Sequence, residues 1–149
     1  MFHHNPHRAN TEPLDMVVDA ETLKHWLADY DTDNIVIGVV ASHSSLQILH
    51  GARMEGFKTL GIAVGENRRR FYKAFPGAEP DEWLMLENYR EMLDHAEWFR
   101  ERNVVIIPHG SLVEYLGSSN FRALEVPTFG NRGILHWESS RARQREWLE

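Results

Sequence analysis

Short, continuously apolar runs alternate with amphipathic segments along most of the chain. The runs are NIVIGVV (34–40), TLGIAV (59–64), WLML (83–86) and NVVIIP (103–108). Because they are apolar throughout rather than at alternate positions, they are typical of parallel strands covered on both faces. The pattern predicts an α/β, Rossmann-like, three-layer domain with a mostly parallel sheet of about four strands and helices on both faces.

The segments around these runs show helical periodicity. ETLKHWLADY (21–30) follows Asp19, a residue that can cap the N-terminus of a helix. Its apolar stripe consists of Leu23, Trp26, Leu27 and Tyr30. Further helices are predicted over residues 44–57, 88–102, 111–117 and 133–149. GENRRRFYKAF (65–75) is predicted to be a basic loop, and RALEVP (122–127) a short extended stretch.

The bulk composition narrows the classes of function. The chain has 149 residues, which suits one domain, a formal net charge of −6 and no cysteine. An acidic chain argues against a broad nucleic-acid or anionic-membrane surface. The lack of cysteine excludes disulfides, thiolate catalysis and cysteine-based zinc sites, and no apolar run approaches the roughly 20 residues that span a bilayer. These features favour a cytoplasmic protein with no nucleic-acid or membrane partner.

The first residues differ from the rest of the chain. Residues 1–18 are predicted to be a flexible extension, and residues 19–149 to be the domain. His3, His4 and His7 lie in the extension, but no carboxylate or cysteine is spaced around them for a metal site. No metal site is therefore predicted.

Small polar residues follow two of the predicted strands. ASHSS (41–45) comes after residues 34–40, and PHGS (108–111) closes the run at 103–108. Parallel sheets bind ligands at the carboxyl ends of strands where the strand order reverses. In the order 3-2-1-4, these two turns would lie side by side. The candidate ligand-binding residues in them are His43, Ser44, His109, Gly110 and Ser111.

Unpaired N–H groups and the positive end of the helix dipole stabilise an anion at such turns. Serine hydroxyls and a histidine add hydrogen-bond donors there. Two structural explanations remain open. Ser44 or Ser45 can simply cap the following helix, and His43 can be a structural histidine.

A third turn, PTFGNRGILHWE (127–138), carries Asn131 and Arg132. The forked donors of Arg132 suit a phosphate or carboxylate, although a surface ion pair would also explain an arginine here. The run Arg68–Arg70, with Lys73 nearby, is the positive cluster of an acidic chain. It either draws in a phosphorylated ligand or forms a solvated loop.

Several motifs are missing. No G-x-G-x-x-G follows residues 34–40, no Walker loop occurs, and no G-x-S-x-G surrounds a candidate serine. Their absence argues against dinucleotide binding, P-loop chemistry and a Ser-His hydrolase respectively.

Taken together, SHSSLQILHGARMEGF, PHGSLVEYLG and VPTFGNRGILHWES resemble the N-terminal region of the archaeal formate-dependent AICAR ligases, or FAICAR synthetases, of the ATP-grasp superfamily. The resemblance runs from about residue 21 to the last residue. It implies that residues 19–149 are a pre-ATP-grasp, substrate-binding domain. The family makes FAICAR from AICAR, formate and ATP in IMP biosynthesis, with formate activated as formyl phosphate.

The resemblance also implies roles for individual residues. His43 and Ser111 match substrate contacts of the family, and their neighbours Ser44, His109 and Gly110 are included with them. Asn131 and Arg132 are given a supporting role. The sequence departs from the expected family pattern at Ala41, Gly133 and His136.

ATP and magnesium sites of the family lie in ATP-grasp domains, for which this chain shows no sequence signal. The chain alone is therefore expected to be inactive and without a cofactor, and to need an ATP-grasp domain in cis or on a split partner. Trp137 or Trp147 of the terminal helix would favour a homo-oligomer. The alternative is a stand-alone module that binds a nucleoside monophosphate without catalysis.

Overall fold

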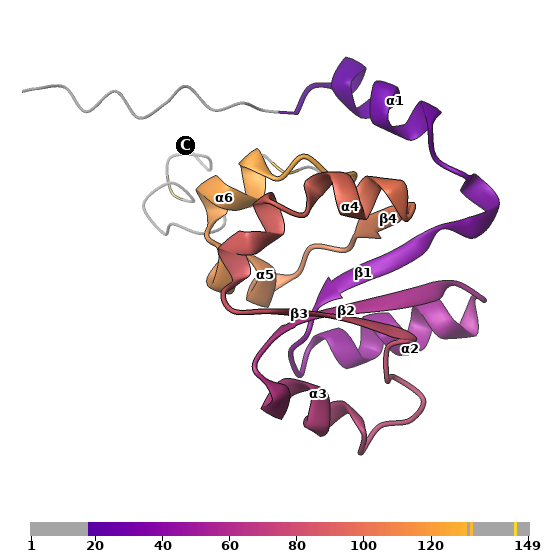
Figure 1. Ribbon diagram of the computed structural model, residues 1–149, viewed down its shortest axis with the longest axis vertical. Helices are drawn as coiled ribbons and strands as arrows, with labels where there is room; N and C mark the ends of the chain where they lie inside the picture. Colours follow the sequence, from indigo (N-terminus) through magenta and orange to yellow (C-terminus); the bar gives the residue numbers. More distant parts are fainter. Residues whose placement is uncertain (1–17, 131, 133–144, 146–149) are drawn as a thin grey trace, which may run out of the picture.

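A parallel sheet organises the part of the chain that the computed structural model describes, which is residues 18–130, 132 and 145. Its strands are β1 (Val36–Val40), β2 (Lys58–Val64), β3 (Glu82–Leu86) and β4 (Val104–Ile106). Their order is β3-β2-β1-β4, and every neighbouring pair is parallel (Figure 1). The predicted α/β class is confirmed. The observed order is the one under which the two polar turns lie side by side.

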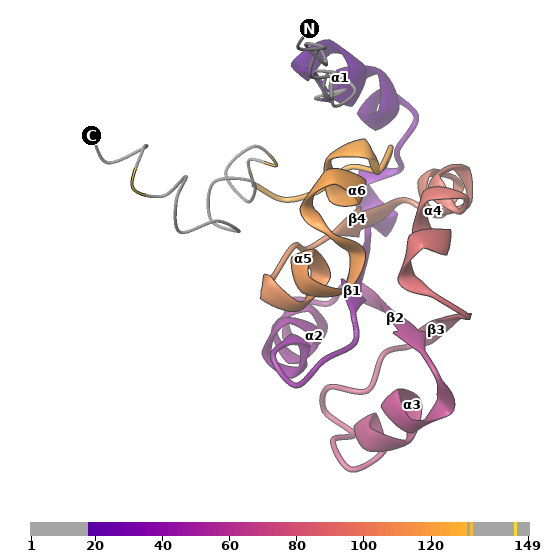
Figure 2. The same ribbon diagram turned by 90° about the vertical axis from the view of Figure 1, so that its left-hand side faces the viewer.

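Helices cover both faces of the sheet. One face carries α2 (Ser45–Met54) and α3 (Glu66–Tyr72), and the other carries α4 (Ala96–Glu101), α5 (Gly110–Leu116) and α6 (Ser118–Ala123) (Figures 1 and 2). This three-layer arrangement follows from the strand order. β2 and then β3 lie on one side of β1, and β4 lies on its other side.

Two hydrophobic clusters explain why the strands are apolar throughout. Val39 belongs to the cluster under α2 and α3, where it packs with Leu49 and Tyr72. The next residue, Val40, belongs to the opposite cluster with Phe99 and Leu112. Successive residues of a strand point to opposite faces, so a strand buried on both sides needs apolar residues at every position.

The predicted basic loop at residues 65–75 is wrong, because α3 occupies Glu66–Tyr72. The helix begins at Gly65, whose φ of +80° favours glycine. It ends in Tyr72, which is fully buried and meets Trp83 edge to face with ring centroids 5.2 Å apart. Burial of that ring against β3 anchors a segment whose charged residues alone suggested a solvated loop.

Two other boundaries also differ from the sequence prediction. The helix expected over 88–102 is interrupted: a 3-10 turn covers Tyr89–Leu93, and α4 begins at Ala96. At the break, Nδ1 of His95 lies 2.8 Å from the carbonyl oxygen of Glu91, so the side chain takes part in the local backbone pairing. The stretch expected to be extended at 122–127 begins inside α6.

The first helix, α1 (Ala20–Ala28), confirms its predicted cap but not its predicted burial. Asp19 accepts a hydrogen bond from the amide of Thr22 at 2.7 Å. No residue of α1 itself is buried, and of the predicted apolar stripe only Tyr30, which follows the helix, is buried. The predicted extension up to residue 17 and the predicted helix at 133–149, apart from residue 145, lie outside the described residues.

The segment after α6 returns to the sheet beside β4. Thr128 forms a parallel bridge with Ile106, and the amide of Phe129 donates to the Ile106 carbonyl oxygen at 3.1 Å. The third polar turn therefore starts at the same carboxyl edge as the other two. Within the described ranges, no helix combines the length and apolar character needed to cross a membrane.

Close packing of β2 predicts a contrast between two glycines. A Cβ added at Gly61 would lie 2.6 Å from Cγ of Pro80 and 2.8 Å from the ring of Trp83, whereas one added at Gly51 in α2 meets nothing within 4 Å. Gly61→Ala should lower the free energy of unfolding by about 1–3 kcal/mol. Gly51→Ala should raise it by up to about 1 kcal/mol, because alanine favours helix. Urea denaturation measures both, and a neutral Gly61→Ala would contradict the packing of β2 described here.

Candidate functional site

The two polar turns meet at the carboxyl edge of the sheet, as the strand order requires. The ring of His109 connects them directly: its Nε2–H donates to the carbonyl oxygen of Val40 at 3.0 Å. His43 is close enough for its charge to influence His109. The structure thus places next to each other the two turns that carry the predicted residues His43, Ser44, His109, Gly110 and Ser111.

His109 is held as a neutral imidazole. Because Nε2 carries the proton that Val40 accepts, the other ring nitrogen, Nδ1, is left as an acceptor. This Nδ1 is buried and has no hydrogen-bond partner among the described residues. Burial lowers the pKa of His109, the Val40 carbonyl opposes that shift, and the nearby His43 adds to it.

The serines of the first turn are fixed by Tyr72 rather than used as helix caps. The amide of Ser42 donates to Oγ of Ser45 at 2.9 Å, and the hydroxyl of Tyr72 donates to the carbonyl oxygen of Ser42 at 2.6 Å. The hydroxyls of Ser45 and Tyr72 are 2.5 Å apart. Ser44 occupies the N-cap position of α2, but its side chain makes no capping hydrogen bond. The network holds the turn in place and leaves His43 exposed between its serines.

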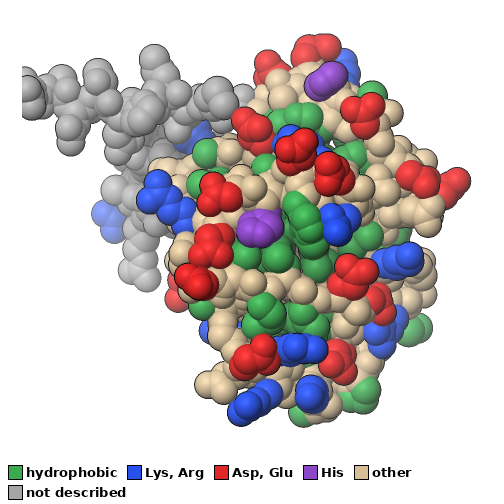
Figure 3. Space-filling view, in the orientation of Figure 1, with side chains coloured by type: hydrophobic (Ala, Val, Ile, Leu, Met, Phe, Trp, Pro, Cys, Tyr) green, Lys and Arg blue, Asp and Glu red, His purple; other side chains and the backbone are tan. Residues whose placement is uncertain are grey.

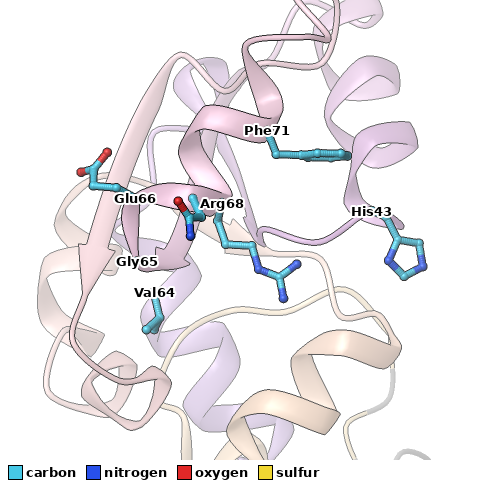
Figure 4. Close-up of a pocket in the computed structure, with 7 residues that line it drawn as sticks. His43, Val64, Gly65, Glu66, Arg68 and Phe71 are labelled. Atoms are coloured by element: carbon cyan, nitrogen blue, oxygen red, sulfur yellow. The ribbon is translucent and has the colours of Figure 1, made fainter.

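A pocket of about 490 Å³ opens beside this turn, between His43 and the segment that leaves β2 (Figure 4). Its other lining residues are Val64, Gly65, Glu66, Asn67, Arg68 and Phe71. His43 is the predicted site residue that lines it. Ser111 is 7% exposed and lies in the first turn of α5, outside this lining.

Arg68 differs from Arg69 and Arg70 in its burial and its contacts. It is half-buried, and its Nη2–H donates to the hydroxyl of Tyr115 in α5 at 3.0 Å. Arg69 and Arg70 are exposed, and the space-filling view shows Lys and Arg side chains gathered over α3 at the lower end of that face (Figure 3). The sequence analysis recognised the basic run but not the special position of Arg68. An assignment of α3 would have placed Arg68 and Tyr72 one turn apart on one helix face.

Arg132 lies at the third turn and is engaged there. Its Nε–H donates to Oγ1 of Thr128 at 3.0 Å, and its two Nη groups donate to the carbonyl oxygens of Leu124 and Val126. Burial lowers the pKa of Arg132 to about 10, so it remains charged at neutral pH. These bonds hold together the chain that leads to the turn. Asn131 lies outside the described residues.

Two further kinds of chemistry find no support in the described residues. No group of three His, Asp or Glu side chains there is arranged to hold a metal ion. No hydrogen bond between a serine hydroxyl and a histidine ring occurs there either: Nε2 of His109 bonds to the Val40 backbone, and its Nδ1 has no partner among these residues. A serine nucleophile activated by histidine would need that contact.

Comparison with known proteins gives one family and a set of archaeal relatives. The family described as "Protein of unknown function (DUF1246)" matches residues 37–149. Proteins named 5-formaminoimidazole-4-carboxamide-1-(beta)-D-ribofuranosyl 5'-monophosphate synthetase are similar to this chain. One from Methanosarcina mazei is 53% identical over 89% of the chain and 37% of the relative, and one from Methanothrix thermoacetophila is 54% identical over the same shares. One from Archaeoglobus fulgidus is 45% identical over 83% of the chain and 33% of the relative. The chain thus spans little more than a third of the length of these relatives.

The buried, neutral His109 predicts a pH dependence of stability. Unfolding restores its ordinary pKa of about 6.5, so the unfolded chain binds the proton first as the pH falls. The contribution of His109 to the free energy of unfolding is therefore fully present above the unfolded-state pKa. It is lost as the pH falls from there toward the lower pKa of the folded state. Denaturant unfolding at about pH 8 and about pH 5 should show a smaller loss for His109→Gln, which keeps a donor for Val40, than for the wild type. His25→Gln, at an exposed position of α1, is the control, and equal losses in the two variants would contradict this assignment.

The Tyr72 network predicts that one hydroxyl stabilises the first turn. Tyr72→Phe removes one of the two hydroxyl donors to the Ser42 carbonyl oxygen, which keeps its bond from Oγ of Ser45 at 2.8 Å, and should cost about 0.5–1.5 kcal/mol in the free energy of unfolding. Ser44→Ala removes an exposed hydroxyl of the same turn and should change it by less than about 0.5 kcal/mol. Chemical denaturation compares the two, and a Tyr72→Phe effect no larger than that of Ser44→Ala would refute the network's role.

Proposed function

This chain belongs to the DUF1246 family, and from that premise we propose that it is the AICAR-binding N-terminal part of an ATP-dependent ligase. The ligase would formylate AICAR with formate to give FAICAR in IMP biosynthesis. In support, about half of the aligned residues are identical to those of archaeal synthetases whose name describes a formylated imidazole-carboxamide ribotide. A protein of this kind needs a site for a 5'-monophosphate.

The observation that carries the proposal is the junction of the two polar turns. The hydrogen bond from His109 to Val40 joins them beside the pocket that His43 lines. α2 begins at this junction without a side-chain cap. The amide of Ser45 donates to the Ser42 carbonyl oxygen at 3.3 Å, and the next N–H groups of the first turn would be the ones to face an anion. The exposed imidazole of His43 adds a donor, and Ser111 provides a hydroxyl from the neighbouring turn. Together these groups suit the phosphate and sugar of a ribotide.

In the proposed reaction the 5-amine of AICAR attacks the carbonyl carbon of formyl phosphate. A C–N bond forms, the C–O bond to the phosphate breaks, and inorganic phosphate leaves. The described residues of this chain would bind and orient the ribotide so that its amine faces the acyl donor. ATP with magnesium would supply the activation of formate in an ATP-grasp region, either in cis or on a partner. We assign no step of that activation to the residues described here, and the chain alone is proposed to be inactive.

The proposed function also implies where the protein acts and what it associates with. A purine-biosynthetic ligase acts on soluble metabolites, so we propose that the chain works in the cytoplasm, without a nucleic-acid or membrane partner. We further propose that it associates with copies of itself.

Isothermal calorimetry with AICAR tests the proposal. The 149-residue chain should bind AICAR, and His43→Ala and Ser111→Ala should each weaken binding by about 1–3 kcal/mol through loss of a hydrogen bond to the ligand. His25→Ala and Ser119→Ala, at exposed positions of α1 and α6, are the matched controls and should bind as the wild type does. The absence of AICAR binding at about 1 mM ligand would refute the proposal. Equal affinity for AICAR and AMP would favour the stand-alone nucleoside-monophosphate-binding module.

A further inference from the structure

Arg68 is a half-buried cation that has no anionic partner among the residues that the structure describes. Its side chain extends from α3 along the pocket wall toward α5, and His43 lies on the other side of the same pocket (Figure 4). Among residues 18–130, 132 and 145, no carboxylate lies within ion-pair distance of its guanidinium. Arg53 and Arg100, by contrast, pair with Asp81 and Glu125.

Tyr115 holds the guanidinium in position. Its hydroxyl accepts the hydrogen bond from Nη2 of Arg68, and Cζ of Arg68 lies 5.4 Å from the centre of its ring. The ring of Tyr115 is itself stacked on Tyr89, with centroids 5.1 Å apart and planes 20° from parallel. A cation held by a hydroxyl and a ring face keeps its full charge and most of its donors.

The other end of α3 is anchored just as firmly. Tyr72 lies one helical turn after Arg68 and bonds to the first polar turn through Ser42 and Ser45. α3 is therefore attached on one side to the turn that carries His43 and on the other to α5. A guanidinium fixed in this way loses little conformational entropy when it binds a ligand.

We propose that Arg68 recognises the phosphate group of the ligand in this pocket, together with His43, and that Tyr115 is the residue that positions it. The site would then select a phosphomonoester over the corresponding nucleoside. A pocket of about 490 Å³ is far larger than formate needs, which favours the phosphate of a ribotide as the anion. The choice of AICAR as that ribotide rests on the proposed function.

The test compares two neighbouring arginines and two ligands. Arg68→Gln and Arg69→Gln make the same change in charge on the same helix, but only Arg68 lines the pocket. Calorimetry with AICAR and with its nucleoside, AICA riboside, separates recognition of the phosphate from recognition of the base and sugar. Arg68→Gln should weaken AICAR binding by about tenfold or more and leave nucleoside binding unchanged, since a charged hydrogen bond is lost. Arg69→Gln should change either affinity by less than about twofold, the range of a screened surface charge.

Tyr115→Phe tests the positioning role. It keeps the ring and removes the hydroxyl, so AICAR binding should weaken less than in Arg68→Gln, again without a change for the nucleoside. A purely structural role of Tyr115 would weaken both ligands alike and would overturn that part of the proposal. Thermal unfolding of each variant checks its fold, and Arg68→Lys, which keeps the charge but lacks the fork, replaces Arg68→Gln if the latter does not fold.

The outcomes distinguish this inference from the function on which it rests. Equal effects of Arg68→Gln and Arg69→Gln on AICAR, or an equal loss of AICAR and nucleoside binding in Arg68→Gln, would overturn the inference while leaving the proposed function intact. If the wild type does not bind AICAR, the proposed function fails, and inorganic phosphate becomes the probe. Phosphate binding that disappears in Arg68→Gln but not in Arg69→Gln would then uphold the role of Arg68. No binding of phosphate to the wild type, or displacement of phosphate by equimolar formate, would overturn it.

Discussion

The central position of β1 is the constraint on which the rest of the structure depends. β1 pairs in parallel with β2 on one side and β4 on the other, and the helices of the connection from β1 to β2 and of the connection from β3 to β4 cover opposite faces of the sheet. The carboxyl ends of both neighbours then flank the turn at residues 41–45. His43, Arg68 and His109 come from segments that follow β1, β2 and β4 respectively. Without this reversal the turns would lie apart, whatever residues they contained.

Hydrogen bonds between uncharged groups hold this edge of the sheet together, and the charge of Arg68 takes no part in them. Tyr72 and His109 each bond to a backbone carbonyl of β1 or its turn, and burial raises the pKa of Tyr72 and lowers that of His109. Both groups are therefore uncharged at neutral pH, and the framework needs no buried ion pair. The positive charge of Arg68 remains unpaired by any carboxylate in the described portion of the chain. In a chain with a net charge of −6, such a cation in a pocket wall is suited to a ligand rather than to folding.

Three arginines of the described residues show how different the roles of this residue type are. Arg132 donates hydrogen bonds to Thr128 and to carbonyl oxygens of the chain before it, so it organises the third turn. Arg68 donates one hydrogen bond to Tyr115, and its other N–H groups remain for a ligand. Arg69 faces solvent. The same residue type in one sequence is thus a structural brace, a candidate ligand contact and a surface charge, and only its surroundings distinguish them.

The sequence by itself determined the strands and the position of the polar turns after them, because burial on both faces demands unbroken apolar runs such as residues 34–40. The order of the strands came from the tertiary structure. Local chemistry also fixed the Asp19 cap. It did not determine α3, the break before α4 or the exposure of α1, since each depends on which partners a segment meets. Only the tertiary structure decided that Tyr72 holds Ser42 and that Tyr115 holds Arg68. Those pairs are 30 and 47 residues apart in the chain. Hydropathy records which side chains avoid water but not which distant group each one will find.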